Sequence, residues 1–234
     1  AAFKGVQQCL RTFMKGYPDD GGCEEGVSYW DCAGASFFES LYFMQFAPKQ
    51  AVLTLTDAQK KKVENMGRFI TTMYINDLTF VNFSDAQAKN IPNINILFPY
   101  GAYLQNEQMM QLAAYVGKKY QYTLKPTTLF LKSGNYPKLG RELMLLSMLS
   151  KYQETAAVQP KTEDAYLANS QIMVASNKNW FVAAKGGNNA ESHNHNDIGN
   201  FIVYQNNQPV VIDLGRDTYT SKSFSNQRFE LMNC

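Results

Sequence analysis

The chain has 234 residues, a net charge of +2 and an apolar content of 45%. This length accommodates one large domain or two ordinary ones with packed cores. The small net charge excludes the strongly basic footprint of a nucleic-acid-binding protein, and no apolar stretch approaches the roughly 20 residues that a membrane span needs.

Helical periodicity dominates the chain up to about residue 150. The first predicted helix ends at Gly16-Tyr17-Pro18. Thr56 and Gln59 form a capping box, which predicts that another helix begins there. The other helices are expected at about 29–46, 106–120 and 139–149. Stacked helical hairpins, as in a helical toroid or solenoid, fit this series.

The pattern changes to short β-rich runs after about residue 162. These runs are separated by Asn- and Gly-rich turns, and they are centred on 172–174, 180–182, 201–204 and 210–212. The segment 150–163 is polar and contains a proline, so it is the candidate linker. The sequence therefore predicts a helical domain followed by the start of a β domain.

Both histidines of the chain lie in the run Ser192-His193-Asn194-His195-Asn196-Asp197. In an extended segment alternate side chains share one face, so His193, His195 and Asp197 point the same way. Imidazole serves either as a proton acceptor near neutral pH or as a zinc ligand. A solvated polar loop explains the run without any chemistry, and the spacing alone leaves both interpretations open.

A predicted hairpin brings another carboxylate towards this run. The segment Gln205-Asn206-Asn207-Gln208 favours a tight turn between two β runs. Folding the chain about that turn places Asp213 opposite Asn200, at the end of the sheet that carries the histidines. We therefore expect Asp213 to lie in the neighbourhood of His193 and His195.

Two separated motifs resemble those of heparinase II/III-like proteins. The run from Ser192 to Tyr204, followed by Pro209-Val-Val-Ile-Asp213-Leu-Gly and Tyr219-Thr220, is similar to the opening of that family's β-sandwich domain. Upstream, the segment from Gly16 to Trp30 contains Asp20-Gly21-Gly22 and resembles a segment of its helical toroid. The two motifs also occur in the order that the family has.

The resemblance implies an α+β multidomain chain. Residues 1–155 would form the C-terminal part of an (α/α) toroid, and residues 156–234 the beginning of an antiparallel β-sandwich. Enzymes of this family are polysaccharide lyases that cleave uronic-acid-containing chains by β-elimination. The resemblance thus implies an acidic polysaccharide substrate, such as heparin, heparan sulfate or alginate, and a periplasmic or secreted bacterial protein; whether it forms a homodimer stays open.

Residue roles follow from the matched motifs. His193 matches the histidine that acts as base or carboxylate neutraliser, and Tyr29 matches the region of the tyrosine that acts as acid. His195 and Asp213 match two ligands of a structural Zn²⁺, whose third ligand, a histidine, is expected beyond Cys234.

Three further residues are candidates for substrate contact on their chemistry alone. Asn194 and Asn196 either bind a substrate carboxylate or orient the histidines, and Trp30 either stacks on a sugar ring or, as is more common for tryptophan, packs in the core.

Two other interpretations of the histidine run stay open. The spacing His193-x-His195-x-Asp197 resembles the first metal motif of metallo-β-lactamase-type hydrolases, although Ile198 stands where those enzymes have another histidine. The second alternative is a non-catalytic carbohydrate-binding relative that has kept the zinc core.

Two further expectations concern the cysteines and the chain ends. The sequence leaves open whether Cys23 and Cys32 form a disulfide or are free thiols. Both ends of the chain look cut, so we expect an internal fragment of a longer protein that is inactive alone.

Overall fold

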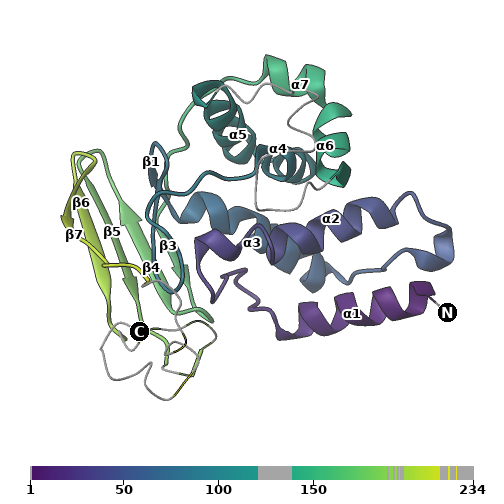
Figure 1. The fold of residues 1–234 in the computed structure, drawn as a ribbon, viewed down its shortest axis with the longest axis horizontal. Helices are drawn as coiled ribbons and strands as arrows, with labels where there is room; N and C mark the ends of the chain where they lie inside the picture. Colours follow the sequence, from purple (N-terminus) through teal and green to yellow (C-terminus); the bar gives the residue numbers. More distant parts are fainter. Residues whose placement is uncertain are drawn as a thin grey trace.

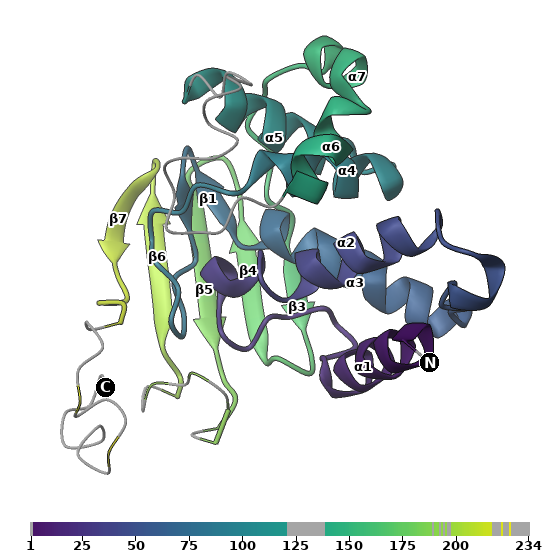
Figure 2. The same ribbon diagram turned by 45° about the vertical axis from the view of Figure 1, so that its right-hand side comes forward.

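The computed structural model describes residues 2–120, 139–188, 190–191, 193, 195, 198–216, 221 and 225. A helical part and a sheet lie side by side, as Figures 1 and 2 show. The last described helix ends at Glu154 and the sheet begins at Ala165. The α+β class that the sequence predicts is confirmed.

The helical part consists of α-helices, two 3-10 turns and one small hairpin in the described residues. Its α-helices are α1 (Ala2–Gly16), α2 (Gly34–Met44), α3 (Asp57–Thr72), α4 (Ile94–Tyr103), α5 (Glu107–Lys119), α6 (Leu139–Leu146) and α7 (Leu149–Glu154). The 3-10 turns are η1 (Val27–Tyr29) and η2 (Lys49–Ala51), and the hairpin strands are β1 (Tyr74–Asn76) and β2 (Thr79–Phe80).

Local capping sets where two of these helices begin. At the start of α3 the Gln59 backbone N–H donates to the Thr56 hydroxyl (3.3 Å), and the Thr56 backbone N–H donates to the Gln59 side chain (2.9 Å). The predicted capping box is therefore confirmed. Helix α5 begins in a related way, because the Asn106 side chain accepts a hydrogen bond from the Met109 N–H (3.0 Å).

Helix α4 lies inside the core and was not predicted. Residues 94–101 are all buried, so the helix has no polar face that would give it an amphipathic period. Tyr100 stacks on Phe38 of α2 with ring centroids 3.9 Å apart, and its hydroxyl donates to the Val63 carbonyl of α3. Helix α4 thus joins α2 and α3 through one buried side chain.

The sheet is antiparallel, and its strands follow one another in the order of the chain. They are β3 (Ala165–Leu167), β4 (Ile172–Ser176), β5 (Trp180–Lys185), β6 (Phe201–Gln205) and β7 (Gln208–Val211). The β6–β7 turn places Asn206 and Asn207 at positive φ, as a type I′ turn requires. Beyond this turn the Asn200 side-chain amide donates to the Asp213 carboxylate, so the predicted juxtaposition is confirmed.

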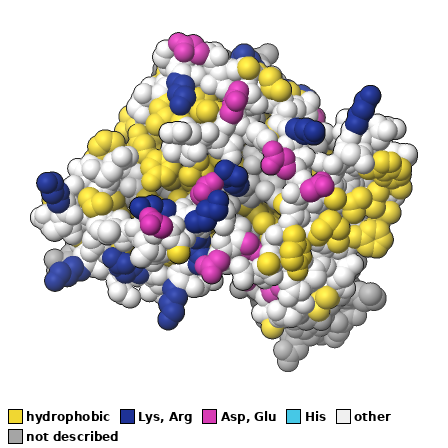
Figure 3. Space-filling model, turned by 180° about the vertical axis from the view of Figure 1, so that it is seen from behind, with side chains coloured by type: hydrophobic (Ala, Val, Ile, Leu, Met, Phe, Trp, Pro, Cys, Tyr) yellow, Lys and Arg dark blue, Asp and Glu magenta, His cyan; other side chains and the backbone are white. Residues whose placement is uncertain are grey.

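Both faces of this sheet carry apolar side chains. The inward face, which includes Val174, Phe181 and Ile202, is buried in the same core as the helices. On the outward face Met173, Trp180 and Phe201 remain partly exposed, and Figure 3 shows yellow side chains gathered over the sheet. Because the helices cover the inward face, the apolar outward face is of the kind that a second sheet covers in a sandwich.

The described cysteines are free thiols. Cys9 and Cys32 are exposed and Cys23 is buried, so the disulfide between Cys23 and Cys32 is not formed. Burial raises the pKa of the Cys23 thiol to about 12, which makes it an unreactive core residue. No helix in the described part of the chain is long and apolar enough to span a membrane.

Candidate functional site

Three loops meet where the helical part contacts the sheet. The first leads from α1 through η1 and carries Glu25 and Tyr29. The second follows β2 and carries Asp85, and the third connects β5 to β6 and carries His193 and His195. The site is therefore shared between the two parts of the molecule.

One buried carboxylate contacts both histidines. Asp85 Oδ2 lies 2.5 Å from His193 Nδ1, and Asp85 Oδ1 lies 3.1 Å from His195 Nε2. Asp85 and His195 are buried, whereas the His193 side chain is 35% exposed. A carboxylate at one ring nitrogen fixes the orientation of an imidazole. Asp85 therefore sets the orientation of the partly exposed His193 ring.

The backbone of His193 is itself unusual. Its φ of 54° lies in the left-handed region, which costs a non-glycine residue about 1–2 kcal/mol. Such conformations persist where surrounding contacts hold them, and they are frequent at functional sites. The contact between the His193 ring and the Asp85 carboxylate helps to keep His193 in this conformation.

Tyr29 lies directly against His193. The two ring centroids are 4.9 Å apart and the rings are inclined at 45°. The sequence places Tyr29 at the start of a helix, but the structure shows it at the end of the η1 turn, with α2 beginning only at Gly34. Glu25 completes this side of the site, with its Oε2 atom 3.5 Å from His193 Nε2.

The Tyr29 segment is fixed against the loop that carries Asp85. The Gln87 backbone N–H donates to the Ser28 hydroxyl at 2.9 Å. Gly26 has a φ of 93°, and a Cβ atom there would lie 2.6 Å from the Phe83 carbonyl oxygen. Only glycine permits both this backbone conformation and this close approach.

A buried lysine links the sheet to the same loop. Lys185 at the end of β5 donates to the Ser84 hydroxyl (2.9 Å), next to Asp85, and pairs with Glu191 (3.0 Å). Burial raises the pKa of the nearby Glu24 carboxyl, and the negative charge of Glu191 raises it further. Two carboxylates, Glu24 and Glu191, therefore lie near the single ammonium group of Lys185.

Among the predicted substrate contacts, Trp30 is corrected by the structure. It is 1% exposed, and its indole N–H donates to the Met66 carbonyl oxygen at 2.7 Å. The ring also stacks on Tyr100, with centroids 6.1 Å apart. It therefore has no free face for a sugar ring, and packing is its role. Asn194 and Asn196 lie outside the described residues.

The predicted zinc ligands both belong to the sheet part of the chain: His195 lies in the β5–β6 connection and Asp213 follows β7. The Asp213 carboxylate accepts hydrogen bonds from the Gly215 N–H (2.6 Å) and from Asn200, while His195 contacts Asp85. In the part of the chain that is described, no three His, Cys, Asp or Glu side chains form a group able to hold a metal. A structural zinc needs four ligands, so the described donors are too few and zinc stays a prediction.

Asp85 and Glu25 are the site residues that the sequence analysis missed. Asp85 belongs to the run 80–86, in which every residue is buried. The available signal was the presence of polar residues (Asn82, Ser84 and Asp85) within a largely apolar run. If such a run is buried, each polar side chain needs a hydrogen-bond partner. The identity of those partners depends on a histidine 108 residues later.

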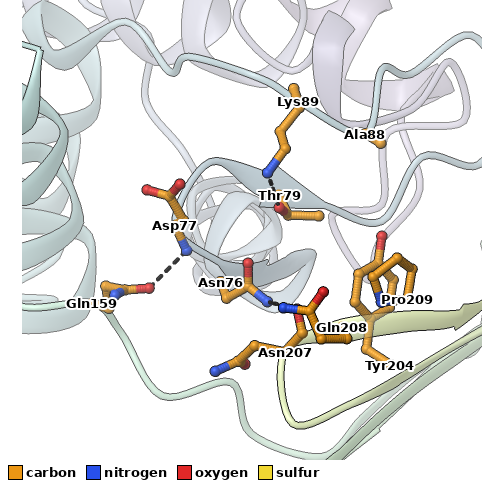
Figure 4. Close-up of a pocket in the computed structure, with 10 residues that line it drawn as sticks. All are labelled: Asn76, Asp77, Thr79, Ala88, Lys89, Gln159, Tyr204, Asn207, Gln208 and Pro209. Carbon is orange, nitrogen blue, oxygen red and sulfur yellow. Dashed lines mark hydrogen bonds between the residues drawn. The ribbon is translucent and has the colours of Figure 1, made fainter.

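A separate cavity of about 450 Å³ lies at the opposite end of the sheet, between the β1–β2 and β6–β7 hairpins (Figure 4). Neither histidine lines it. Its polar groups largely satisfy one another: Lys89 donates to Thr79 (2.7 Å), and Gln159 accepts from the Asp77 N–H (2.7 Å). The loop junction around Asp85 is therefore the stronger candidate site.

Comparisons with known proteins show two similarities. Residues 159–230 match the family model described as heparinase II/III-like, C-terminal. The chain is also similar to the crystal structure of a heparan sulfate lyase HepC mutant from Pedobacter heparinus, with 16% sequence identity and a TM-score of 0.56. This match covers 97% of the chain but only 30% of the lyase. None of the curated proteins matches the chain.

Proposed function

Because residues 159–230 match the family model described as heparinase II/III-like, C-terminal, we propose that this chain carries the active-site region of a polysaccharide lyase. The reaction is β-elimination on a uronic-acid-containing polysaccharide. The observation that carries this proposal is the contact between Tyr29 and His193, whose ring centroids lie 4.9 Å apart across the junction of helical part and sheet. The structural relative, a heparan sulfate lyase, supports the same class of reaction.

β-Elimination requires two proton transfers and a neutralised carboxylate. The C5 proton leaves, a double bond forms between C4 and C5, and the bond from C4 to the glycosidic oxygen breaks. We assign His193, whose side chain is 35% exposed, to the C5 side, where its imidazole accepts the proton or neutralises the uronate carboxylate. Tyr29 donates its phenolic proton to the departing oxygen. The products are an unsaturated uronate and a free hydroxyl group.

Asp85 acts on this reaction through His193. Its carboxylate contacts His193 Nδ1 and so fixes the orientation of the ring beside Tyr29. Because Asp85 is buried, it serves as a positioning residue that is out of reach of the polysaccharide. The substrate class that we propose is an acidic polysaccharide of the heparan sulfate or alginate type, met in the periplasm or outside the cell.

Ultraviolet absorbance of the unsaturated uronate tests this function directly. We expect the full-length protein to give a rising signal with one of a panel of uronate polysaccharides. Tyr29→Phe and His193→Ala should each lower the rate by about 10²–10⁴-fold, since each removes a proton-transfer group. Tyr166→Phe is the matched control, because Tyr166 is 68% exposed on β3 and should leave the rate unchanged.

A folded protein that gives no signal with any of these polymers contradicts the lyase. In that case the non-catalytic, carbohydrate-binding alternative becomes the better account. Binding of the same polymers, measured by calorimetry, would then distinguish that alternative from a protein without affinity for them.

A further inference from the structure

The loop after α1 contacts the sheet through one carboxylate. Asp20 Oδ2 accepts hydrogen bonds from the backbone N–H groups of Asn169 (2.6 Å) and Ser170 (2.8 Å) in the β3–β4 turn. Asp20 Oδ1 accepts from the Ser170 hydroxyl (3.0 Å) and from the N–H of Gly22 (2.9 Å). In Figure 2 this dark purple loop passes in front of the strands. Asp20 therefore joins segments about 150 residues apart.

The two glycines that follow allow this contact. A Cβ atom on Gly22 would lie 1.8 Å from the Ser170 hydroxyl oxygen, so a side chain there would push the turn away. Gly21 has a φ of 77°, and a Cβ atom there would lie 2.2 Å from the backbone of Asn65 in α3. The loop is thus pressed against α3 on one side and against the sheet on the other.

The same loop carries the catalytic tyrosine. Tyr29 follows Asp20 by nine positions, while His193 belongs to the sheet side of the site. We propose that Asp20-Gly21-Gly22 is a clasp between the helical part and the sheet, and that Asp20 is a positioning residue for the Tyr29–His193 pair. The positioning role rests on the proposed lyase function, whereas the clasp itself does not.

A purely local role for Asp20 is the competing explanation. Its bond to the Gly22 N–H is an ordinary Asx turn, which would shape the loop without any contribution from the sheet. Ser170 separates the two explanations, because it belongs to the sheet and is 4% exposed. The clasp predicts that changes at Gly22 and Ser170 compensate each other, and a local turn does not.

The decisive experiment combines a clash with its relief in the full-length protein. Gly22→Ala introduces the clash with Ser170, and the added Ser170→Gly removes the atoms that it meets. We expect Gly22→Ala to speed hydrogen exchange of segments 165–171 and 23–32 by about tenfold or more. We expect the double variant to return both segments towards the wild-type rates. Failure of this rescue overturns the clasp.

A second pair of variants distinguishes a local loss of the Asp20 contact from general unfolding. Asp20→Asn should speed exchange at the Asn169 and Ser170 amides, while Asp19→Asn should not. Asp19 is a matched control, because its side chain is 84% exposed and pairs with Lys62 rather than the sheet. Equal exchange at these amides in both variants overturns the clasp.

Turnover tests the positioning role separately. If the protein is a lyase, Asp20→Asn should lower kcat more than it raises KM, because substrate still binds while the proton donor is displaced. An unchanged kcat alongside faster exchange overturns positioning but leaves the clasp. If the wild-type protein has no lyase activity, the proposed function and the positioning role are both wrong. Hydrogen exchange still tests whether the clasp forms.

Discussion

The two sides of the site are built in different ways. On the helical side Asp85 lies in a fully buried run, and the neighbouring loop is fixed through Gly26 and Ser28. On the sheet side His193 lies in the connection 186–200, is partly exposed and has a strained backbone. The difference indicates that the helical side sets the geometry and that His193 takes its position from Asp85.

The largest expected effect concerns the rigidity of the helical side. Arg141 of α6 is completely buried. It forms ion pairs with Asp31 and with Glu39 (2.7 Å), and it also donates to the backbone carbonyl of Asp31 (2.9 Å). Asp31 follows Tyr29 by two positions, so these contacts hold the segment next to the site. Arg141→Met removes the cation from these carboxylates and should lower the free energy of unfolding by about 3 kcal/mol. Urea denaturation measures the change.

An exposed arginine provides the comparison for that variant. Arg68 of α3 pairs with Glu64 at 2.7 Å, but its side chain is 53% exposed. Arg68→Met should cost at most about 1 kcal/mol, because water screens the pair. Equal losses in the two variants would show that burial of Arg141 does not stabilise the helical side.

The second effect tests whether Asp85 controls His193. Asp85→Asn keeps the shape of the side chain but removes the charge, and it should lower kcat roughly 10–100-fold with the fold retained. Asp57→Asn is the control, since Asp57 is 97% exposed at the start of α3 and pairs only with Lys60 among the described contacts. Steady-state rates that fall equally in both variants would contradict a special role for Asp85.

The smallest effect is a pH dependence at the edge of the site. Burial raises the folded-state pKa of Glu24 above its ordinary value of 4.5. The folded state therefore binds this proton more tightly, and the resulting stability is present below pH 4.5 and is lost as the pH rises through the raised pKa. Glu24→Gln should match the wild type in acid and be slightly more stable at pH 7, by less than about 1 kcal/mol.

Thermal unfolding from acid to neutral pH checks this prediction. Glu163→Gln is a control for the loss of a surface charge, because Glu163 is exposed in the linker before β3. A stability gain for Glu24→Gln that persists unchanged in acid would contradict the assigned cause.

Local signals were enough to predict much of the fold. The capping box at Thr56 and the turn at Asn206 and Asn207 depend on a few adjacent residues, and the turn also placed Asp213 beside Asn200. Helix α4 escaped prediction because burial on all sides removes the amphipathic pattern. Amphipathic periodicity therefore detects helices at a surface and misses those inside a core.

The site was only half predictable for a related reason. Tyr29 and His193 stand in recognisable motifs, and the structure brings them together. Asp85 stands in no motif, and the role that we propose for it arises from contacts with residues more than 100 positions away. Trp30 differs from Asp85 because it does stand in a motif. Its aromatic ring made it a candidate for substrate contact, but the fold buries it.

The central claim is that Asp85 of the helical part and His193 of the sheet part act as one unit. A double-mutant cycle on kcat, with Asp85→Asn, His193→Ala and the combined variant, tests this most directly. We expect the combined loss to be clearly smaller than the product of the two single losses, because Asp85 positions the His193 ring. Multiplication of the two single losses would show that Asp85 acts independently and would contradict the account.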